Sequence, residues 1–377
     1  MYLTIFTTSK QETVLPSFEE VLLNPYLTIE QPNIEIQKRT IIVSEEYGKK
    51  LYDKRITNTM HEVIIASKPP AEIPADELAQ HYNYYTIAKR TDPTKRRQIE
   101  DPDGILRTIQ GHYKYIIDEI LKVQAHDAAF GYIKQRDIKR STERHQKNES
   151  RWFLKLDLKD FFPSINKEFL RKQLDMVYPF RFLPEEFMEG LIKYSLLNNS
   201  LPQGTYTSPL LSNLVMVPID YDITKTLTNY NKHHFVYTRY ADDIEISCRE
   251  KFNPKEITDI VSQIFKNYNA PFRINHEKTT FGSNAGSNYH LGLNLNKDNQ
   301  ISKGYRKNNK FRAMLHQFAL NPNDASYETL NKILGIIAHF RYIEPGFVEK
   351  TLHKYNEKFN IDIEKEIKRR LACQESR

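Results

Sequence analysis

The sequence predicts an α+β fold that is built around a split βαβ unit and continues into a helical C-terminal region. Runs of β-forming residues alternate with longer segments whose apolar residues recur at helical spacing. The central elements follow the order strand, helix, helix, hairpin, helix, strand, which fits a split βαβ arrangement. From about Asn308 onward the chain is helical in pattern and rich in Lys and Arg.

The first eighty residues have no clear periodicity, and we treat them as an N-terminal extension. Lys68-Pro69-Pro70 and Ile73-Pro74 indicate a linker or turn region at the end of this extension. Two strands are then predicted at 84–88 and 97–100, because β-forming residues stand on both sides of the turn residues Asp92-Pro93.

Helices and strands of the central region are predicted from apolar spacing and from capping residues. The apolar residues of 105–123 recur at helical spacing, and Ser164 is expected to cap the helix that follows a strand at 152–158. The remaining predictions are helices at 184–197, 208–227 and 257–268, a hairpin within 235–247 and a short strand at 289–295. We therefore divide the chain into residues 1–80, 81–300 and 301–377.

Composition restricts the class of protein. The chain has 377 residues, of which 39% are hydrophobic and 12% aromatic, and this excludes a disordered chain. A net charge of +7 favours polyanionic partners such as nucleic acid. Two cysteines, Cys248 and Cys373, cannot build a disulfide framework, so we expect a cytoplasmic protein. No run approaches the roughly 18 apolar residues of a membrane-spanning helix, so we expect no membrane partner.

Three aspartates occupy positions that suit a pair of bound cations. Asp242-Asp243 lies in the predicted hairpin, and Asp157 lies near the end of the strand at 152–158. Two Mg²⁺ ions about 3.5–4 Å apart can activate an attacking 3′ oxygen and stabilise a leaving pyrophosphate. Such ions need carboxylates that converge from different strands. An Asp-Asp pair is also common in ordinary turns, and Asp157 is also compatible with a simple strand end.

The motifs around these acids resemble those of bacterial reverse transcriptases of the retron and group II intron type. The resemblance covers roughly residues 84–350, and the motifs occur in the family's order. They are the fingers motif at 95–102, the catalytic motifs at 155–165 and 237–243, the substrate motif at 201–209, the lysine motif at 273–279 and the primer-grip turn at 291–293. The resemblance implies a right-hand polymerase with fingers and palm at 81–300 and a helical thumb at 301–377.

The resemblance also implies an RNA-directed DNA polymerase with assigned catalytic residues. Asp157, Asp242 and Asp243 are expected to hold two Mg²⁺ ions, for which Mn²⁺ is a substitute. Lys278 is expected to lie near the leaving group as a proton donor. Together these residues imply that deoxynucleotides are added by two-metal phosphoryl transfer.

Five further residues are expected to bind the incoming nucleotide. Lys95 and Arg97 neutralise its triphosphate. Gln203 and Gly204 lie against nucleotide and template, and a glycine allows close backbone approach. A bulky ring at Phe162 leaves no room for a 2′-hydroxyl and thereby selects deoxynucleotides. The alternative for Phe162 is an ordinary core aromatic.

Several departures separate this chain from typical relatives. Ser141-Thr142-Glu143-Arg144-His145 replaces the Asn-Ala-x-x-His element of retron enzymes, and His290-Leu291-Gly292 replaces their Val-Thr-Gly. Tyr206 and Glu245 also differ from the commonest residues at their positions. Gln203 argues against diversity-generating retroelements, and the chain ends soon after the expected thumb, unlike group II intron proteins. We therefore expect a stand-alone, defence-associated reverse transcriptase rather than a true retron enzyme.

The expected partners follow from this function. They are an RNA template, the DNA product and deoxynucleotides, together with a cognate non-coding RNA and a partner protein that residues 1–80 could contact. The sequence leaves open the oligomeric state, template-independent or protein-primed DNA synthesis, and retron msDNA synthesis by the same site. Phe162 disfavours an RNA polymerase. A catalytically silent nucleic-acid scaffold is disfavoured by the complete set of Asp157, Asp242, Asp243, Lys278 and Arg97.

Overall fold

The computed structural model describes residues 2–5, 39–42, 69–88, 93–230, 234–286 and 291–375. They belong to two compact units, which we call the mixed unit and the helical unit. The mixed unit comprises Met1–Asp137, Leu154–Ser247 and Phe252–Phe281, and the helical unit comprises Ile138–Phe153, Cys248–Lys251 and Gly282–Arg377. Most of the predicted N-terminal extension lies outside the described residues; within it, β1 (Tyr2–Ile5) pairs antiparallel with β2 (Arg39–Ile42).

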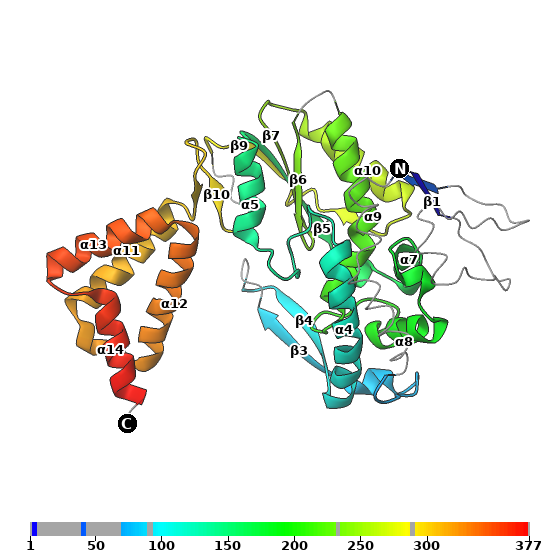
Figure 1. The fold of residues 1–377 in the computed structure, drawn as a ribbon, viewed down its shortest axis with the longest axis horizontal. Coiled ribbons are helices and arrows are strands. Elements are labelled where there is room, and N and C mark those ends of the chain that lie inside the picture. Colours follow the sequence, from blue (N-terminus) through cyan, green and yellow to red (C-terminus); the bar gives the residue numbers. More distant parts are fainter. Residues whose placement is uncertain are drawn as a thin grey trace, which may run out of the picture. The chain divides into compact units, whose positions relative to one another are not determined.

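A five-stranded sheet forms the centre of the mixed unit (Figure 1). Its order is β6-β7-β5-β8, and a fifth strand, β9, also pairs with β5. Consecutive strands β6 and β7 form the predicted hairpin, whereas β5 reaches the sheet from much earlier in the chain. The strands are β5 (Trp152–Lys159), β6 (Val236–Tyr240), β7 (Asp243–Cys248), β8 (Arg273–Ile274) and β9 (Thr280–Ser283).

Helix α9 (Ser208–Asn229) is the central helix of the mixed unit and packs against α4, α7 and α10. Most of its residues are buried, which explains why it lacks a polar face. The other described helices of the mixed unit are α4 (Gly104–Gln124), α6 (Phe161–Ser164), α7 (Lys167–Leu174), α8 (Glu185–Ser195) and α10 (Pro254–Asn267). Two short 3₁₀ segments, η1 (Leu78–His81) and η2 (Phe180–Phe182), also belong to it.

One capping prediction is wrong. Ser164 ends α6, and its hydroxyl donates to the carbonyl of Phe161 at 2.8 Å. The cap of α7 is Asn166, whose side chain accepts from Phe169 N–H. Both residue types are good caps, and the short α6 turn, which the apolar pattern does not indicate, shifts the helix start by two positions.

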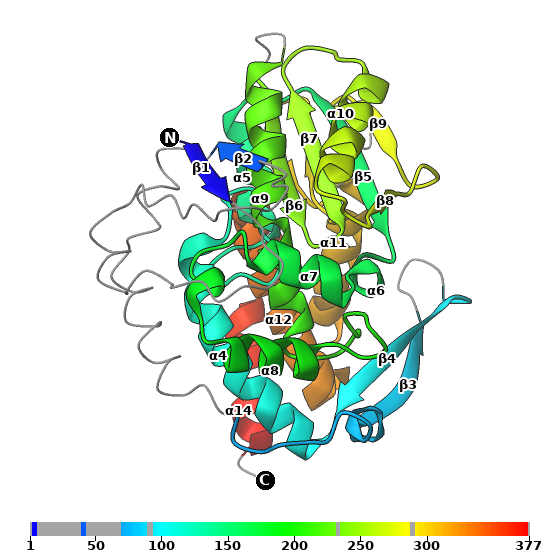
Figure 2. The same ribbon diagram turned by 90° about the vertical axis from the view of Figure 1, so that its right-hand side faces the viewer.

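A second hairpin lies apart from the main sheet (Figure 2). It consists of β3 (Tyr82–Ala88) and β4 (Arg96–Pro102), which pair antiparallel. After Tyr82, every residue of β3 is exposed. The predicted strands 84–88 and 97–100 are therefore confirmed, although the predicted turn residue Asp92 lies outside the described residues.

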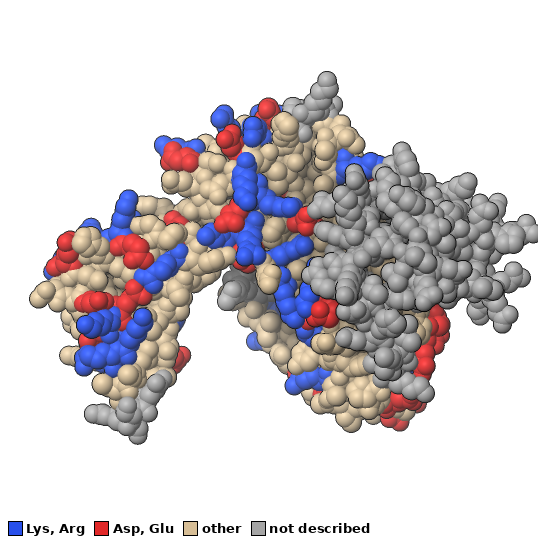
Figure 3. All heavy atoms as spheres, viewed as in Figure 1, with Lys and Arg blue, Asp and Glu red and all other residues tan. Residues whose placement is uncertain are grey.

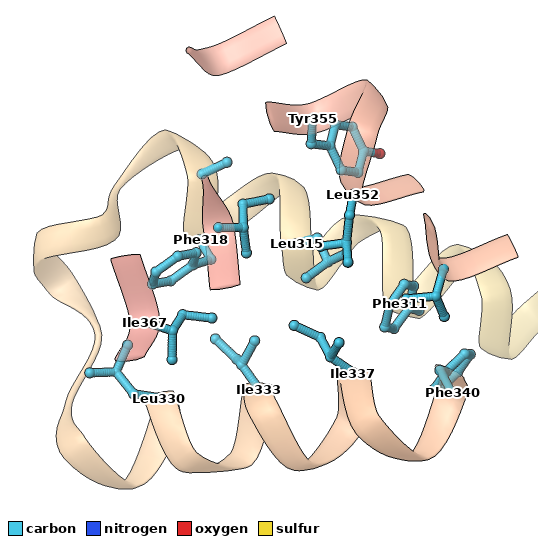
Figure 4. Close-up of a cluster of buried hydrophobic side chains, with 13 residues drawn as sticks. Phe311, Leu315, Phe318, Leu330, Ile333, Ile337, Phe340, Leu352, Tyr355 and Ile367 are labelled. Carbon is cyan, nitrogen blue, oxygen red and sulfur yellow. The ribbon is translucent and has the colours of Figure 1, made fainter. Parts of the chain in front are cut away.

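Four helices form the body of the helical unit. They are α11 (Tyr305–Leu320), α12 (Tyr327–Ile343), α13 (Pro345–Phe359) and α14 (Ile363–Glu375), with η3 (Pro322–Asp324) between the first two. Their apolar faces meet in one core, in which Phe311 of α11 stacks on Phe340 of α12 with ring centroids 4.4 Å apart (Figure 4). The helical prediction for the C-terminal region is confirmed.

The rest of the helical unit differs from the prediction. Helix α5 (Ile138–Lys147) was not predicted; it packs against β10 (Asn294–Leu295) and β11 (Ile301–Ser302). The predicted strand at 289–295 is wrong for residues 291 and 292, which form a turn, and residues 289 and 290 lie outside the described residues. Figure 3 shows Lys and Arg side chains gathered over α5, where the exposed cations are Arg140, Arg144 and Lys147.

Candidate active site

The tip of the β6–β7 hairpin carries the paired aspartates. Tyr240 pairs with Asp243, so only Ala241 and Asp242 form the loop. Ala241 is 3% exposed and has a φ of +55°, a backbone conformation that two-residue hairpin loops require at their first position. The tight turn that positions Asp242 and Asp243 therefore depends on an unusual backbone conformation at Ala241.

A buried ion pair joins this hairpin to helix α9. Arg239 of β6 and Asp220 of α9 are both fully buried, and Arg239 Nη2 lies 2.7 Å from Asp220 Oδ2. The hydroxyl of Tyr237 donates to the same carboxylate at 2.6 Å. Arg239 Nη1 also donates to the side chain of Asn213 and to the carbonyl of Ala241. Because each buried charge is paired and hydrogen-bonded, the network fixes the hairpin to α9.

A loop from residues 126–133 reinforces the other side of the hairpin. Phe130 N–H donates to the carbonyl of Arg239, and Arg239 N–H donates to the carbonyl of Ala128. At Gly131 a Cβ atom would stand 2.9 Å from Ala241 N, so any side chain there would displace the catalytic turn. This close approach explains the glycine and brings the next residue, Tyr132, into the site.

Asp157 reaches the same site from the neighbouring strand β5. Leu158 N–H donates to the carbonyl of Asp242 at 3.1 Å, which joins the two strands at the level of the acids. The Asp157 carboxylate accepts from Lys278 Nζ at 2.8 and 2.9 Å and from Asn275 Nδ2 at 3.1 Å. Asp157 and Lys278 are 121 residues apart in sequence, so only the fold brings them together.

The acids influence one another electrostatically. Burial raises the pKa of Asp243 to about 6, with contributions from the negative charges of Asp242 and Asp157. Burial also raises the pKa of Asp242, and Asp157 adds to that shift. The hydrogen bond to Asp157 raises the pKa of Lys278. The site thus concentrates negative charge that a bound cation would stabilise.

Glu245 has a physical explanation in this arrangement. Its side chain is buried beneath the acids, where burial raises its pKa. Lys155 of β5 supplies the opposite charge: burial lowers the pKa of Lys155, and the charges of Glu245 and Asp243 oppose that shift. The positive charge of Lys155 lies close enough to Asp243 to oppose part of the rise in the Asp243 pKa.

A cleft of about 650 Å³ opens in front of the acids. Of the nine predicted site residues, six line it: Arg97, Asp157, Phe162, Gln203, Asp242 and Lys278. Arg96, Glu100, Tyr132 and Asn275 also line it and were not predicted. Lys95, Gly204 and Asp243 are not among the lining residues.

Gly204 lies behind the cleft wall and joins it to the β3–β4 hairpin. It has a φ of +120°, and a Cβ atom there would stand 2.7 Å from Ile99 Cγ2. Its neighbour Gln203 is bonded twice to Glu100: Glu100 N–H donates to the carbonyl of Gln203, and Gln203 N–H donates to the carboxylate of Glu100. The close approach expected for Gly204 is therefore to β4.

Two adjacent phenylalanines have different environments. Phe161 is 3% exposed and contacts Phe272 in the core. Phe162 is half-buried, lines the cleft and contacts Tyr132 edge-on, with centroids 6.2 Å apart. Both rings line the cleft, but Phe161 is almost fully buried and Phe162 is the more accessible of the two.

The missed residues share one property: their partners are distant in sequence. The sequence could have indicated Arg239 and Asp220, because each is a charged residue within an apolar segment and a buried charge must be paired. Tyr132 carried none, since its loop has no periodic pattern. Among the described residues, no three acidic, histidine or cysteine side chains gather tightly enough to make a ready-formed metal site.

No helix in the described parts of the chain is sufficiently long and apolar to span a membrane.

The chain is similar to known proteins over the region that contains this site. Residues 87–314, more than half of the chain, match the family described as reverse transcriptase (RNA-dependent DNA polymerase). The retron Ec73 reverse transcriptase of Escherichia coli is 31% identical over 289 residues, which are 71% of this chain and 89% of that protein. The retron Ec83 reverse transcriptase of Escherichia coli is 29% identical over 309 residues, covering 78% and 91%.

Among solved structures, apo telomerase from Candida tropicalis has a TM-score of 0.47 and 14% identity, covering 83% of this chain and 68% of that one. The family match and the retron relatives confirm the resemblance drawn from the motifs. The chain belongs to the reverse transcriptase family and is an RNA-directed DNA polymerase of the bacterial retron-like class.

Proposed function

We propose that this chain extends a primer along an RNA template, adding deoxynucleotides by two-metal phosphoryl transfer at the cleft. The observation that carries the proposal is that Asp157 and Asp242 line one cleft with Lys278, Arg97 and Phe162. Acids, a proton donor, a phosphate-binding cation and a sugar-contacting ring are the parts such a reaction needs.

Asp157, Asp242 and Asp243 would hold two Mg²⁺ ions, with Mn²⁺ as a substitute. Their carboxylates suit a hard cation. Burial, together with the negative charge of the neighbouring acids, raises the pKa of Asp242 and Asp243, and a bound cation would offset both effects. When bound, the ions supply activation of the 3′ oxygen and stabilisation of the leaving pyrophosphate.

The other residues bind and orient the nucleotide. Arg97, with Lys95 and Arg96 beside it, would neutralise the triphosphate. Lys278, whose ammonium group lies 2.8 Å from Asp157, would donate a proton to the leaving pyrophosphate. Gln203, held by Glu100, would contact the base pair that forms, and Phe162 would exclude a 2′-hydroxyl.

Primer extension on RNA with deoxynucleotides and Mg²⁺ tests the proposal. We expect product from the wild type and at least a thousandfold less from Asp242→Ala/Asp243→Ala, because electrostatic stabilisation of the transferring phosphoryl group is lost. Asp259→Ala, an exposed acid of α10, is the matched control and should extend normally. Equal activity in the wild type and the double variant would refute the assignment.

We further propose that the template is a cognate non-coding RNA, and that the biological role is antiviral defence in the cytoplasm. The departures at 141–145 and at Leu291-Gly292 support a role apart from that of typical retron enzymes. Sequencing the RNA that co-purifies with the protein, together with phage challenge of cells carrying it, tests both parts. An RNA-free protein and unchanged phage sensitivity would contradict them.

Retron msDNA synthesis by the same site is the second candidate. It is favoured by the similarity to two retron reverse transcriptases from Escherichia coli. DNA that remains joined to its RNA after purification would favour this candidate. Product formed without any template would instead favour template-independent or protein-primed synthesis.

A further inference from the structure

Tyr132 lines the cleft and has a strained backbone conformation that contacts with neighbouring segments must stabilise. Its φ is +59°, which a bulky residue adopts only at an energetic cost. The preceding residue is held by Asn213, whose Nδ2 donates to the carbonyl of Gly131 at 2.7 Å. Hydrogen bonds between the loop and Arg239 hold the residues before it. A strained residue fixed by several segments of the chain is typical of a functional position.

The ring of Tyr132 lies between two residues of the catalytic motifs. Its centroid is 6.2 Å from that of Phe162, at an interplanar angle of 68°, and 6.1 Å from that of Tyr240. Edge-to-face pairs at this separation attract each other. The three rings therefore make a continuous aromatic wall, with Tyr132 in contact with both neighbours.

Tyr132 is nevertheless accessible. It is 45% exposed and lines the cleft together with Asp157 and Asp242. A tyrosine that only filled the core would be buried, as Tyr113 is.

We propose that Tyr132 is a positioning residue for sugar selection: its ring supports the edge of Phe162 and keeps Phe162 where it excludes a 2′-hydroxyl. This inference rests on the proposed function, in which Phe162 contacts the sugar. Without the Tyr132 ring, Phe162 has space into which it can turn, and a ribonucleotide is then admitted. Because the aromatic ring and not the hydroxyl contacts Phe162, a phenylalanine in place of Tyr132 should preserve sugar selection.

Single-nucleotide insertion on a primed RNA template tests the proposal. The measurement is the ratio of kcat/KM for a deoxynucleotide to kcat/KM for the matching ribonucleotide. We expect Tyr132→Ala to lower this ratio roughly three- to tenfold, the strength of one aromatic contact, while Tyr132→Phe keeps it. Tyr115→Ala, which removes a 60% exposed tyrosine of α4, is the control and should also keep it.

Phe162 variants separate this inference from the proposed function. Phe162→Ala should lower the ratio further, and the double variant with Tyr132→Ala should fall no lower than Phe162→Ala alone, since Tyr132 acts through Phe162. An unchanged ratio in Tyr132→Ala, with the loss in Phe162→Ala intact, would overturn the inference alone. A loss in Tyr132→Phe would also overturn it, because the hydroxyl would then be responsible. A wild-type protein that inserts no nucleotide would overturn the proposed function and the inference together.

Discussion

The two hairpins of the mixed unit contribute opposite charges to one cleft and are supported in opposite ways. The β6–β7 hairpin carries Asp242 and Asp243, lies within the five-stranded sheet and is anchored by the buried Arg239–Asp220 pair. The β3–β4 hairpin carries Arg97 and is a separate two-stranded sheet, exposed along nearly all of β3.

The two kinds of support suit the different roles proposed for the acids and for Arg97. Under the proposed function, acids that share cations would need positions fixed within a fraction of an ångström, which a buried network provides. Side chains that neutralise a mobile triphosphate, as proposed for Arg97, would need less exact placement, because a screened ionic contact tolerates displacement. An isolated two-stranded hairpin is only marginally stable, so β3–β4 depends on its attachments to Gln203 and α4.

Arg239→Met should produce the largest loss of stability, because it leaves the buried Asp220 carboxylate without its partner. We expect the free energy of unfolding to fall by about 3–5 kcal/mol, measured by urea titration with circular dichroism. Adding Asp220→Leu should recover much of this loss, since no uncompensated charge then remains. A loss below about 1 kcal/mol in Arg239→Met would show that the network does not anchor the β6–β7 hairpin.

Arg97→Ala should affect substrate binding and leave stability almost unchanged. The side chain is exposed, so we expect a change in unfolding free energy within about 0.5 kcal/mol. The loss of a charge-assisted contact of about 1.5–3 kcal/mol should raise KM for deoxynucleotides at least tenfold in primer extension. Lys350→Ala in α13 is an exposed control with normal KM expected. An unchanged KM in Arg97→Ala would remove Arg97 from triphosphate binding.

Asp103→Ala should have the smallest effect, and the effect should depend on pH. Asp103 caps α4 through Leu106 N–H and pairs with His81 at 2.6 Å, which ties together the two ends of the β3–β4 hairpin. Burial alone would raise the pKa of Asp103, but these hydrogen bonds outweigh it and lower the pKa. A lowered pKa stabilises the fold above the unfolded-state pKa, and this stabilisation is lost as the pH falls through the folded-state pKa.

We therefore expect Asp103→Ala to lose about 1 kcal/mol at pH 7 and less near pH 3. Thermal unfolding at the two pH values measures the difference. Ser326→Ala, which removes the cap of α12, is the matched control, because a serine cap does not titrate and its loss should be the same at both. Equal losses at both pH values for Asp103→Ala would show that its charge contributes nothing.

Local patterns in the sequence predicted most of the helices and strands, and the motifs around the acids indicated the family. Apolar spacing predicted α4 and α10, β-forming runs predicted β5 and the β6–β7 hairpin, and the acids lay within those runs. The α+β fold and the reverse transcriptase family are confirmed. Helix α5 was missed because its apolar residues are few, and its support comes from strands some 150 residues later in the chain.

The packing of distant segments determined which side chains come into contact. The sequence identified Asp157 and Lys278 separately, but their 2.8 Å contact depends on β5 and the segment after β8 meeting. The same holds for Arg239 with Asp220, for Glu245 with Lys155, and for Tyr132 with Phe162. The physical reason is that helix and strand formation depend on neighbours within a few positions, whereas burial and charge pairing depend on which faces pack. A sequence pattern records the first kind of interaction directly and the second only through the completed fold.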